Sequence, residues 1–159
     1  LEETETILLD YQSRTSVALA RILMKHHWKL NPVMEDSNGE EFIHKIGGKT
    51  AGLVIGDRAL EQRSKHPFIY DLGEAWKNFT GLGFVFAAWI SNKQIDPLFL
   101  NLFNAANELG LEHLPEIISE NPYPHIDLHD YYTQNISYFI NNDKRKGLDL
   151  FLKMLLDQQ

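Results

Sequence analysis

A short apolar run, a polar cluster and a segment with helical spacing follow one another at the start of this chain. Residues 6–9 are Thr-Ile-Leu-Leu, a composition typical of a strand. Over residues 15–28 the apolar side chains recur three or four positions apart, which predicts a helix; they are Val17, Ala20, Leu23, Met24 and Trp28. A strand that leads directly into an amphipathic helix restricts the chain to folds in which helices cover a sheet.

The same alternation continues to residue 90. Further strands are predicted at 33–35, 51–55, 68–71 and 84–90, and further helices at 40–46 and 73–80. Beyond residue 90 the pattern is helical, at 96–109, 114–119 and 128–139 and at the C-terminal end, with a turn at Gly110. We therefore expect an α/β fold with a mostly parallel sheet over residues 4–90 and a helical part over residues 91–159.

The polar cluster between the first strand and the first helix is a candidate anion site. Ser13, Thr15 and Ser16 are natural helix caps, because their hydroxyls can satisfy the free N–H groups of the first turn. Those N–H groups and the helix dipole attract anions, and the Arg14 guanidinium matches a carboxylate in two-point geometry. A plain capped helix start that binds no ligand is the alternative, and this stretch alone leaves both open.

A second junction of the same kind follows the strand predicted at 51–55. Here Gly56 allows the backbone to be approached closely, and Asp57 can cap the next helical turn.

Composition narrows the classes of partner. The chain has 159 residues, of which 43% are apolar, enough for one compact domain or two small lobes. A formal net charge of −7 argues against nucleic acid or an anionic membrane surface as the main partner, and no apolar segment approaches the ~20 residues that span a bilayer. The sequence has no cysteine, which excludes disulfides, zinc-thiolate sites and thiol catalysis and agrees with a cytoplasmic protein.

Two pairs of polar residues have spacings used in chemistry, but each has a plainer explanation. His125 and His129 are four apart, as metal ligands on a helix are, yet Pro124 places His125 at or before the helix start. Asp71 and Glu74 could form an acid–base pair, but a cap followed by a favourable first-turn charge is the explanation we favour. We expect no metal site, and no phosphate-loop or dinucleotide fingerprint predicts a cofactor.

Three longer stretches carry a resemblance to a known family. They are DYQSRTSVAL at residues 10–19, LVIGDRAL at 53–60 and YDLGEAWKNFTGLGFVFAAW at 70–89. In order and spacing they resemble the chorismate dehydratase family of the futalosine route to menaquinone, and residues 136–151 are similar to that family's C-terminal end. The sister enzymes that act later in the pathway share the DLGExW region but normally carry a Thr-rich helix start, which favours the dehydratase.

The resemblance implies a two-lobed fold like the type II periplasmic binding proteins, with the ligand in the cleft. It implies a carbon–oxygen lyase that removes water from chorismate to give 3-[(1-carboxyvinyl)oxy]benzoate, without a cofactor. Chorismate is a dianion, and both junctions are expected to line the crevice at the carboxyl ends of the strands. The predicted substrate-binding residues are Ser13, Arg14, Thr15, Ser16, Gly56 and Asp57. No catalytic base is identified, and the substrate's own carboxylate can assist the elimination.

The chain departs from the family pattern at two places. Gly83 stands where the family has Pro, and the family's N-terminal segment, which builds the first lobe's sheet, is absent from this sequence. Without that cover, the apolar stripes of the C-terminal helices are expected to stay exposed. A non-catalytic solute-binding protein for a small carboxylate is the alternative function, and an inactive fragment is a third. A homodimer is one of the assemblies open to this chain.

Overall fold

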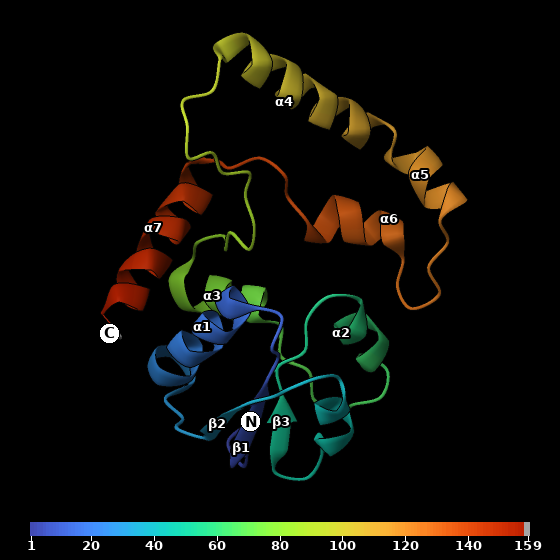
Figure 1. The fold of residues 1–159 in the computed structure, drawn as a ribbon. Coiled ribbons are helices and arrows are strands. Elements are labelled where there is room, and N and C mark those ends of the chain that lie inside the picture. The colour runs from blue at the N-terminus through green and yellow to red at the C-terminus, as the bar shows by residue number, and fades with distance from the viewer. Residues whose placement is uncertain (158–159) are drawn as a thin grey trace. The chain divides into compact units, whose positions relative to one another are not determined.

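The structure is a computed structural model that describes residues 1–157. The chain forms two compact units, Leu1–Phe86 with Ile140–Gln159, and Ala87–Phe139. Figure 1 labels the helices and strands of both units. The sequence predicts an α/β lobe over residues 4–90 and a helical part of a second lobe over residues 91–159. This assignment to lobes stays a prediction.

The first unit is built on a parallel three-stranded sheet. β1 (Thr6–Leu9) is the central strand, with β2 (Val33–Asp36) on one side and β3 (Thr50–Gly52) on the other. Ile7, Leu8 and Leu9 are all buried, as in a strand that is covered on both faces. The predicted α/β class and the parallel strand direction are confirmed, although β3 is shorter than the run of apolar residues that predicts it.

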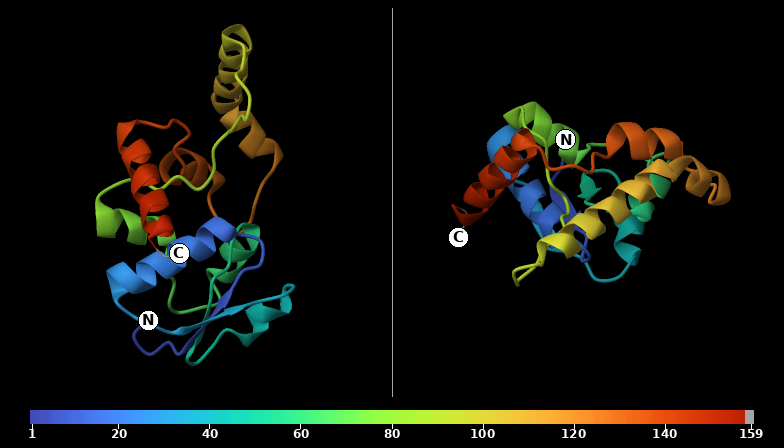
Figure 2. Two further views of the ribbon diagram at one scale, coloured as in Figure 1. Left: turned by 60° about the vertical axis from the view of Figure 1, so that its left-hand side comes forward. Right: turned by 90° about the horizontal axis from the view of Figure 1, so that it is seen from above.

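Three helices of this unit pack together. α1 (Arg14–Leu23) continues into a π-helical turn (Met24–Trp28), which ends at Lys29 in the left-handed region, so the helix predicted over 15–28 is confirmed. α3 (Leu72–Thr80) and α7 (Asn142–Leu156) both contact α1, and Figure 2 shows the three close together. A 3-10 helix (Glu41–Lys45) and the short α2 (Asp57–Gln62) complete the unit.

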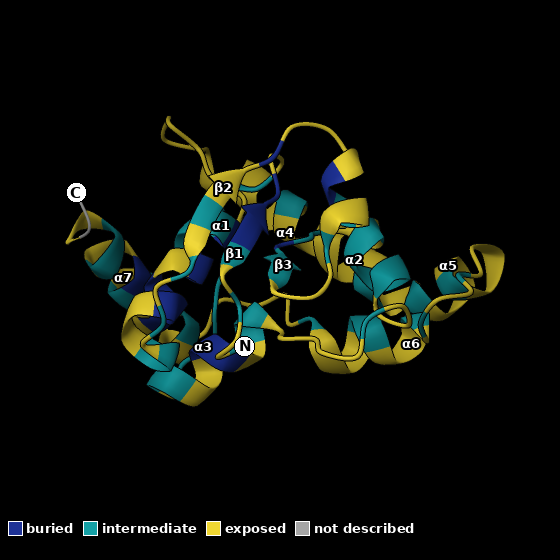
Figure 3. Ribbon diagram, turned by 90° about the horizontal axis from the view of Figure 1, so that it is seen from below, coloured by how far each residue is buried: buried dark blue, intermediate teal, exposed yellow. Residues whose placement is uncertain are grey.

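The centre of these helices is Trp76, which is 0% exposed. It meets Phe84 and Phe151 edge to face, with ring centroids 5.5 Å and 6.2 Å apart. Figure 3 shows buried residues on β1, α1, α3 and α7. The expectation that the stripe of the last helix stays uncovered is therefore wrong for Phe151, because α1 and α3 supply its cover.

Two predicted strands do not form. Residues 68–71 and 84–90 are irregular, and neither pairs with a strand in the described part of the chain. Several of their large side chains are exposed, among them Phe68 (77%), Trp89 (82%) and Ile90 (91%). Apolar, β-branched composition records how well a residue suits a pleated and covered surface, and it forms a strand only where a neighbouring strand is available.

The second unit is helical within its described residues. It contains α4 (Pro97–Glu112), α5 (Leu114–Glu120), α6 (Leu128–Asp130) and a π-helical turn (Tyr131–Asn135). Asp96 caps α4 through its side chain, as its Asp-Pro start predicts, but Gly110 lies inside this helix and the predicted turn there is wrong. None of the helices described in either unit combines the length and the apolar character needed to cross a membrane.

Candidate functional site

The two polar junctions of the first unit lie next to each other. β1 and β3 are parallel neighbours, so both end at the same edge of the sheet. The backbone N–H of Ile55, just before Gly56, donates a hydrogen bond of 3.2 Å to Oδ2 of Asp10, just after β1. The predicted proximity of the two junctions is therefore confirmed.

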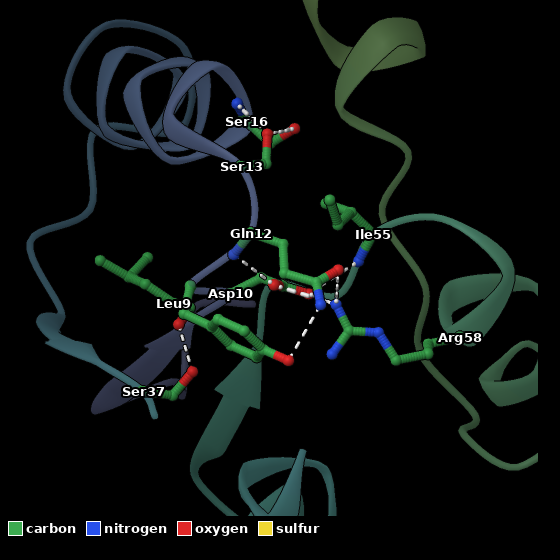
Figure 4. A network of polar contacts seen from close by, with 9 residues as sticks. Leu9, Asp10, Gln12, Ser13, Ser16, Ser37, Ile55 and Arg58 are labelled. Carbon is green, nitrogen blue, oxygen red and sulfur yellow. Dashed lines mark hydrogen bonds and ion pairs between the residues drawn. The ribbon is translucent and has the colours of Figure 1, made fainter. Parts of the chain in front are cut away.

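Asp10 is the centre of the polar network at this edge (Figure 4). Asp10 as a whole is 2% exposed. Its carboxylate accepts hydrogen bonds from the Gln12 N–H at 2.9 Å and from Arg58. Nη2 of Arg58 lies 3.1 Å from Oδ1 and 2.8 Å from Oδ2, and the Arg58 side chain is 16% exposed. This is a largely desolvated ion pair with its carboxylate well supplied with donors.

Two neighbouring side chains complete the surroundings of Arg58. Nη2 also donates to Gln12 Oε1 at 3.0 Å, and Gln12 Nε2 donates to the Tyr11 hydroxyl at 2.9 Å. The guanidinium carbon lies 5.5 Å from the centroid of the Tyr11 ring. Nη1 of Arg58 is buried without an acceptor among residues 1–157.

The start of α1 has the features of an anion site that the sequence predicts. Ser13 is the N-cap; its Oγ accepts from the Ser16 N–H at 3.0 Å and donates to Ser16 Oγ at 2.8 Å. Within the described residues, the backbone N–H groups of Arg14 and Thr15 donate to no acceptor. Arg14 is exposed, Thr15 is half-buried and Ser16 is buried. Two free N–H groups at a helix start can receive a carboxylate.

Gly56 and Asp57 are both exposed at the neighbouring junction. Gly56 has φ 65° and ψ −153°, a combination that essentially only glycine adopts, so the loop can turn here because no side chain is present. Gly56 is itself the N-cap of α2, and Asp57 is the first residue of the helix. The predicted capping role of Asp57 is therefore wrong, and its carboxylate is instead a first-turn charge open to solvent.

A hollow of about 280 Å³ lies at the carboxyl end of β2. Its lining includes Asp36, Ser37 and Glu41 but none of the six predicted substrate-binding residues. Ser37 is buried and donates its hydroxyl to the Leu9 carbonyl. Because three carboxylates and one lysine are among its lining residues, this hollow is a poor receptor for an anion, and the helix start of α1 remains the candidate site.

The other polar candidates have structural roles or exposed positions. Asp71 Oδ1 accepts from the Glu74 N–H at 2.9 Å, so the capping interpretation of this pair is confirmed. His125 precedes α6 whereas His129 lies in it, so the two do not share a helix. His129 instead gathers with Asp127 and Asp130, all three exposed, with one ligand atom from each within 4.8 Å of the others.

Asp10 and Arg58 are the residues of this site that sequence reasoning does not identify. Both lie inside quoted motifs, DYQS and GDRAL, but they are 48 positions apart. A buried ion pair between distant positions has no spacing rule comparable to that of a helix cap. The one sequence feature that points to this pair is an Asp directly after an apolar strand. An acidic side chain buried there needs a partner, but the sequence does not reveal which residue it is.

Two comparisons with known proteins agree with the motifs. A family model described as menaquinone biosynthesis matches residues 1–157. The curated chorismate dehydratase of Thermus thermophilus is 26% identical over 172 residues, which cover 94% of this chain and 62% of that protein. The chain therefore spans less than two thirds of the length of this relative.

Proposed function

Because this chain belongs to the menaquinone biosynthesis family, we propose that it takes part in that pathway as a chorismate dehydratase. It is a carbon–oxygen lyase of the cytoplasm that converts chorismate to 3-[(1-carboxyvinyl)oxy]benzoate. The fold proposed for it is the two-lobed fold of the type II periplasmic binding proteins, and a homodimer is its proposed assembly. The six predicted residues at the two junctions form part of the wall of the substrate cleft.

The start of α1 is the observation that supports this proposal. A dianionic substrate must be bound by a chain with a net charge of −7, so attraction has to come from local groups. Such groups are the backbone N–H groups of Arg14 and Thr15, which have no acceptor among residues 1–157, and the exposed Arg14 guanidinium. The Thr15 hydroxyl adds a further donor at the same end of the helix.

The neighbouring junction contributes shape. No side chain atom at Gly56 stands between the loop and a ligand, and nothing lies within 4 Å of the position where a Cβ would be. Asp57 is exposed beside it, and a carboxylate there repels a second anion but accepts a hydrogen bond from a hydroxyl. This arrangement orients a hydroxyl-bearing dianion with one carboxylate toward α1.

The reaction requires little from the protein beyond positioning. One ring proton leaves, the neighbouring C–O bond breaks and the hydroxyl departs as water, so the ring becomes aromatic. No side chain of the two junctions is an evident strong base, and a carboxylate of the substrate takes the ring proton when the substrate is held in a reactive conformation. The same carboxyl group then returns a proton to the departing hydroxyl, so that one water leaves and the carboxylate is regenerated. Donors at the helix start stabilise the charge that this conformation brings together.

Incubation of the purified protein with chorismate tests the proposal. We expect the aromatic product to appear in the ultraviolet spectrum, and mass spectrometry to show the loss of one water. Calorimetry on the same sample separates catalysis from binding alone. Binding without turnover would favour a solute-binding protein, and the absence of both would contradict the proposal.

A further inference from the structure

Arg58 is a largely buried cation at the point where the two junctions meet. Its side chain is 16% exposed, and the Asp10 side chain that it faces is 0% exposed. A charged pair removed from water is tolerated best when its remaining polar atoms are satisfied. Asp10 meets this condition with donors from three different places in the chain, whereas Nη1 of Arg58 has no acceptor among residues 1–157.

The pair joins segments that the sheet alone leaves separate. Gln12 belongs to the loop between β1 and α1, Ile55 to the loop after β3, and Arg58 to the first turns of α2. All three donate to the Asp10 carboxylate, so one side chain fixes the separation of the loops. Ser13, the N-cap of α1, is the residue immediately after Gln12.

Direct contact between Arg58 and a ligand fits these surroundings poorly. Its Nη2 already serves three acceptor oxygens, and its Nη1 is buried with the Tyr11 ring close to the guanidinium. Asp10 also balances its charge, which weakens any attraction for an anion. Arg14, in contrast, is exposed at the start of α1.

We propose that Arg58 is a positioning residue: together with Asp10 it holds the start of α1 at the separation from Gly56 and Asp57 that lets both junctions contact one anionic substrate. The identity of that substrate rests on the proposed function. The role of Arg58 in fixing the two loops is independent of it. An offset of about 1 Å in such a contact can lower a rate by ~10²-fold, so a residue that never touches the substrate can control its binding.

Three variants test this role. Arg58→Met removes the charge and the hydrogen bonds but keeps much of the length. Arg58→Lys keeps the charge on a shorter side chain that can donate to a carboxylate. Arg63→Met is a matched control because Arg63 is exposed at the end of α2. Amide hydrogen exchange reports the loops, and calorimetry with chorismate as the probe reports the site.

We expect Arg58→Met to speed exchange at the hydrogen-bonded amides of Gln12, Ile55 and Ser16 by at least ~10-fold, with α7 unchanged, because only the junctions open. Chorismate should bind ~10-fold more weakly, the equivalent of about 1.4 kcal/mol. Arg58→Lys should recover part of both effects, and Arg63→Met should show neither.

The outcomes are separable. Unchanged exchange at the two loops, or faster exchange with intact chorismate affinity, would overturn the positioning role. If the unsubstituted protein binds no chorismate, the proposed function fails, and the exchange rates alone decide whether Arg58 holds the loops. If Arg58→Met does not fold, its amides exchange rapidly everywhere. Exchange at the two loops and chorismate affinity are then compared between Arg58→Lys and the unsubstituted protein, and unchanged values for both would overturn the positioning role.

Discussion

The polar residues at the start of α1 divide into groups that hold the helix and groups that face outward. Ser13 and Ser16 hydrogen-bond each other, whereas the backbone N–H groups of Arg14 and Thr15 are unpaired within the described chain. The cap at Ser13 could be predicted because it depends on residues within one turn. The Asp10–Arg58 pair could not, since its two members are brought together only by the pairing of β1 with β3.

At the residue scale we expect the double substitution Thr15→Ala and Ser16→Ala to weaken binding of chorismate by at least ~1–2 kcal/mol. The Thr15 hydroxyl can then no longer hydrogen-bond a charged group, and Ser16 Oγ no longer orders Ser13 at the helix start. The free energy of unfolding should fall by only ~1 kcal/mol, since Ser13 still caps the helix. Calorimetry and urea denaturation measure the two quantities.

Ser64→Ala is the matched control for this prediction, because Ser64 is an exposed hydroxyl in the same unit. It should change neither quantity. An unchanged affinity together with a large loss of stability would mean that the hydroxyls at 15 and 16 serve only to hold the helix.

At the scale of elements, local signals predict the helices well and the strands only in part. α1, α3 and α4 carry caps and periodic apolar residues, and all three form where these signals place them. Residues 84–90 have the most apolar composition in the chain yet form no strand, because strand formation depends on a partner that composition does not reveal. Gly110 remains helical because its flanking helix formers outweigh the ~1 kcal/mol penalty of one glycine.

Two glycines in helices should respond oppositely to alanine. A Cβ at Gly147 of α7 would lie 2.1 Å from the Gly83 carbonyl oxygen, so helix and loop would have to separate. We expect Gly147→Ala to lower the free energy of unfolding by ~1–3 kcal/mol through overpacking. At Gly110 nothing lies within 4 Å of such a Cβ, and alanine should leave stability unchanged or raise it by up to ~1 kcal/mol. Equal effects in thermal denaturation would refute the close contact of α7 with the loop at 83.

The aromatic cluster gives a second test of how α7 is held. Phe151→Ala removes a side chain that is 5% exposed and packs against Trp76 and Phe84. We expect a loss of ~3–5 kcal/mol in the free energy of unfolding. Leu152→Ala, one position along at 46% exposure, should cost less than ~1 kcal/mol. Similar losses in chemical denaturation would mean that α7 does not close this core.

At the scale of the whole molecule, apolar surface is unevenly covered. The first unit encloses two buried clusters, whereas α4 of the second unit exposes large side chains such as Leu98 (68%), Phe99 (57%) and Leu102 (63%). Here the expectation of exposed helical stripes is confirmed, because apolar periodicity identifies the faces that need cover but not the surface that supplies it. Each such side chain contributes roughly 1.5–3 kcal/mol when it becomes fully buried.

We therefore expect the 159-residue chain to self-associate through these exposed apolar side chains. Replacing Leu98 and Leu102 by Gln should lower the associated fraction seen in analytical ultracentrifugation, with little change in the stability of the first unit. Asn104→Gln is the control on the same helix and should leave association unchanged, since Asn104 is exposed and already polar. A chain that stays monodisperse and monomeric at high concentration would contradict the expectation.

The discontinuity of the first unit sets an order of events during synthesis. Its strands and its first three helices are complete by Phe86, but the cluster around Trp76 also needs Phe151, which is translated after the whole of the second unit. At about 5–20 residues per second, the ribosome leaves this half-built core open for several seconds. During that interval Trp76 lacks the cover of Phe151, and this cluster closes only once α7 has left the exit tunnel.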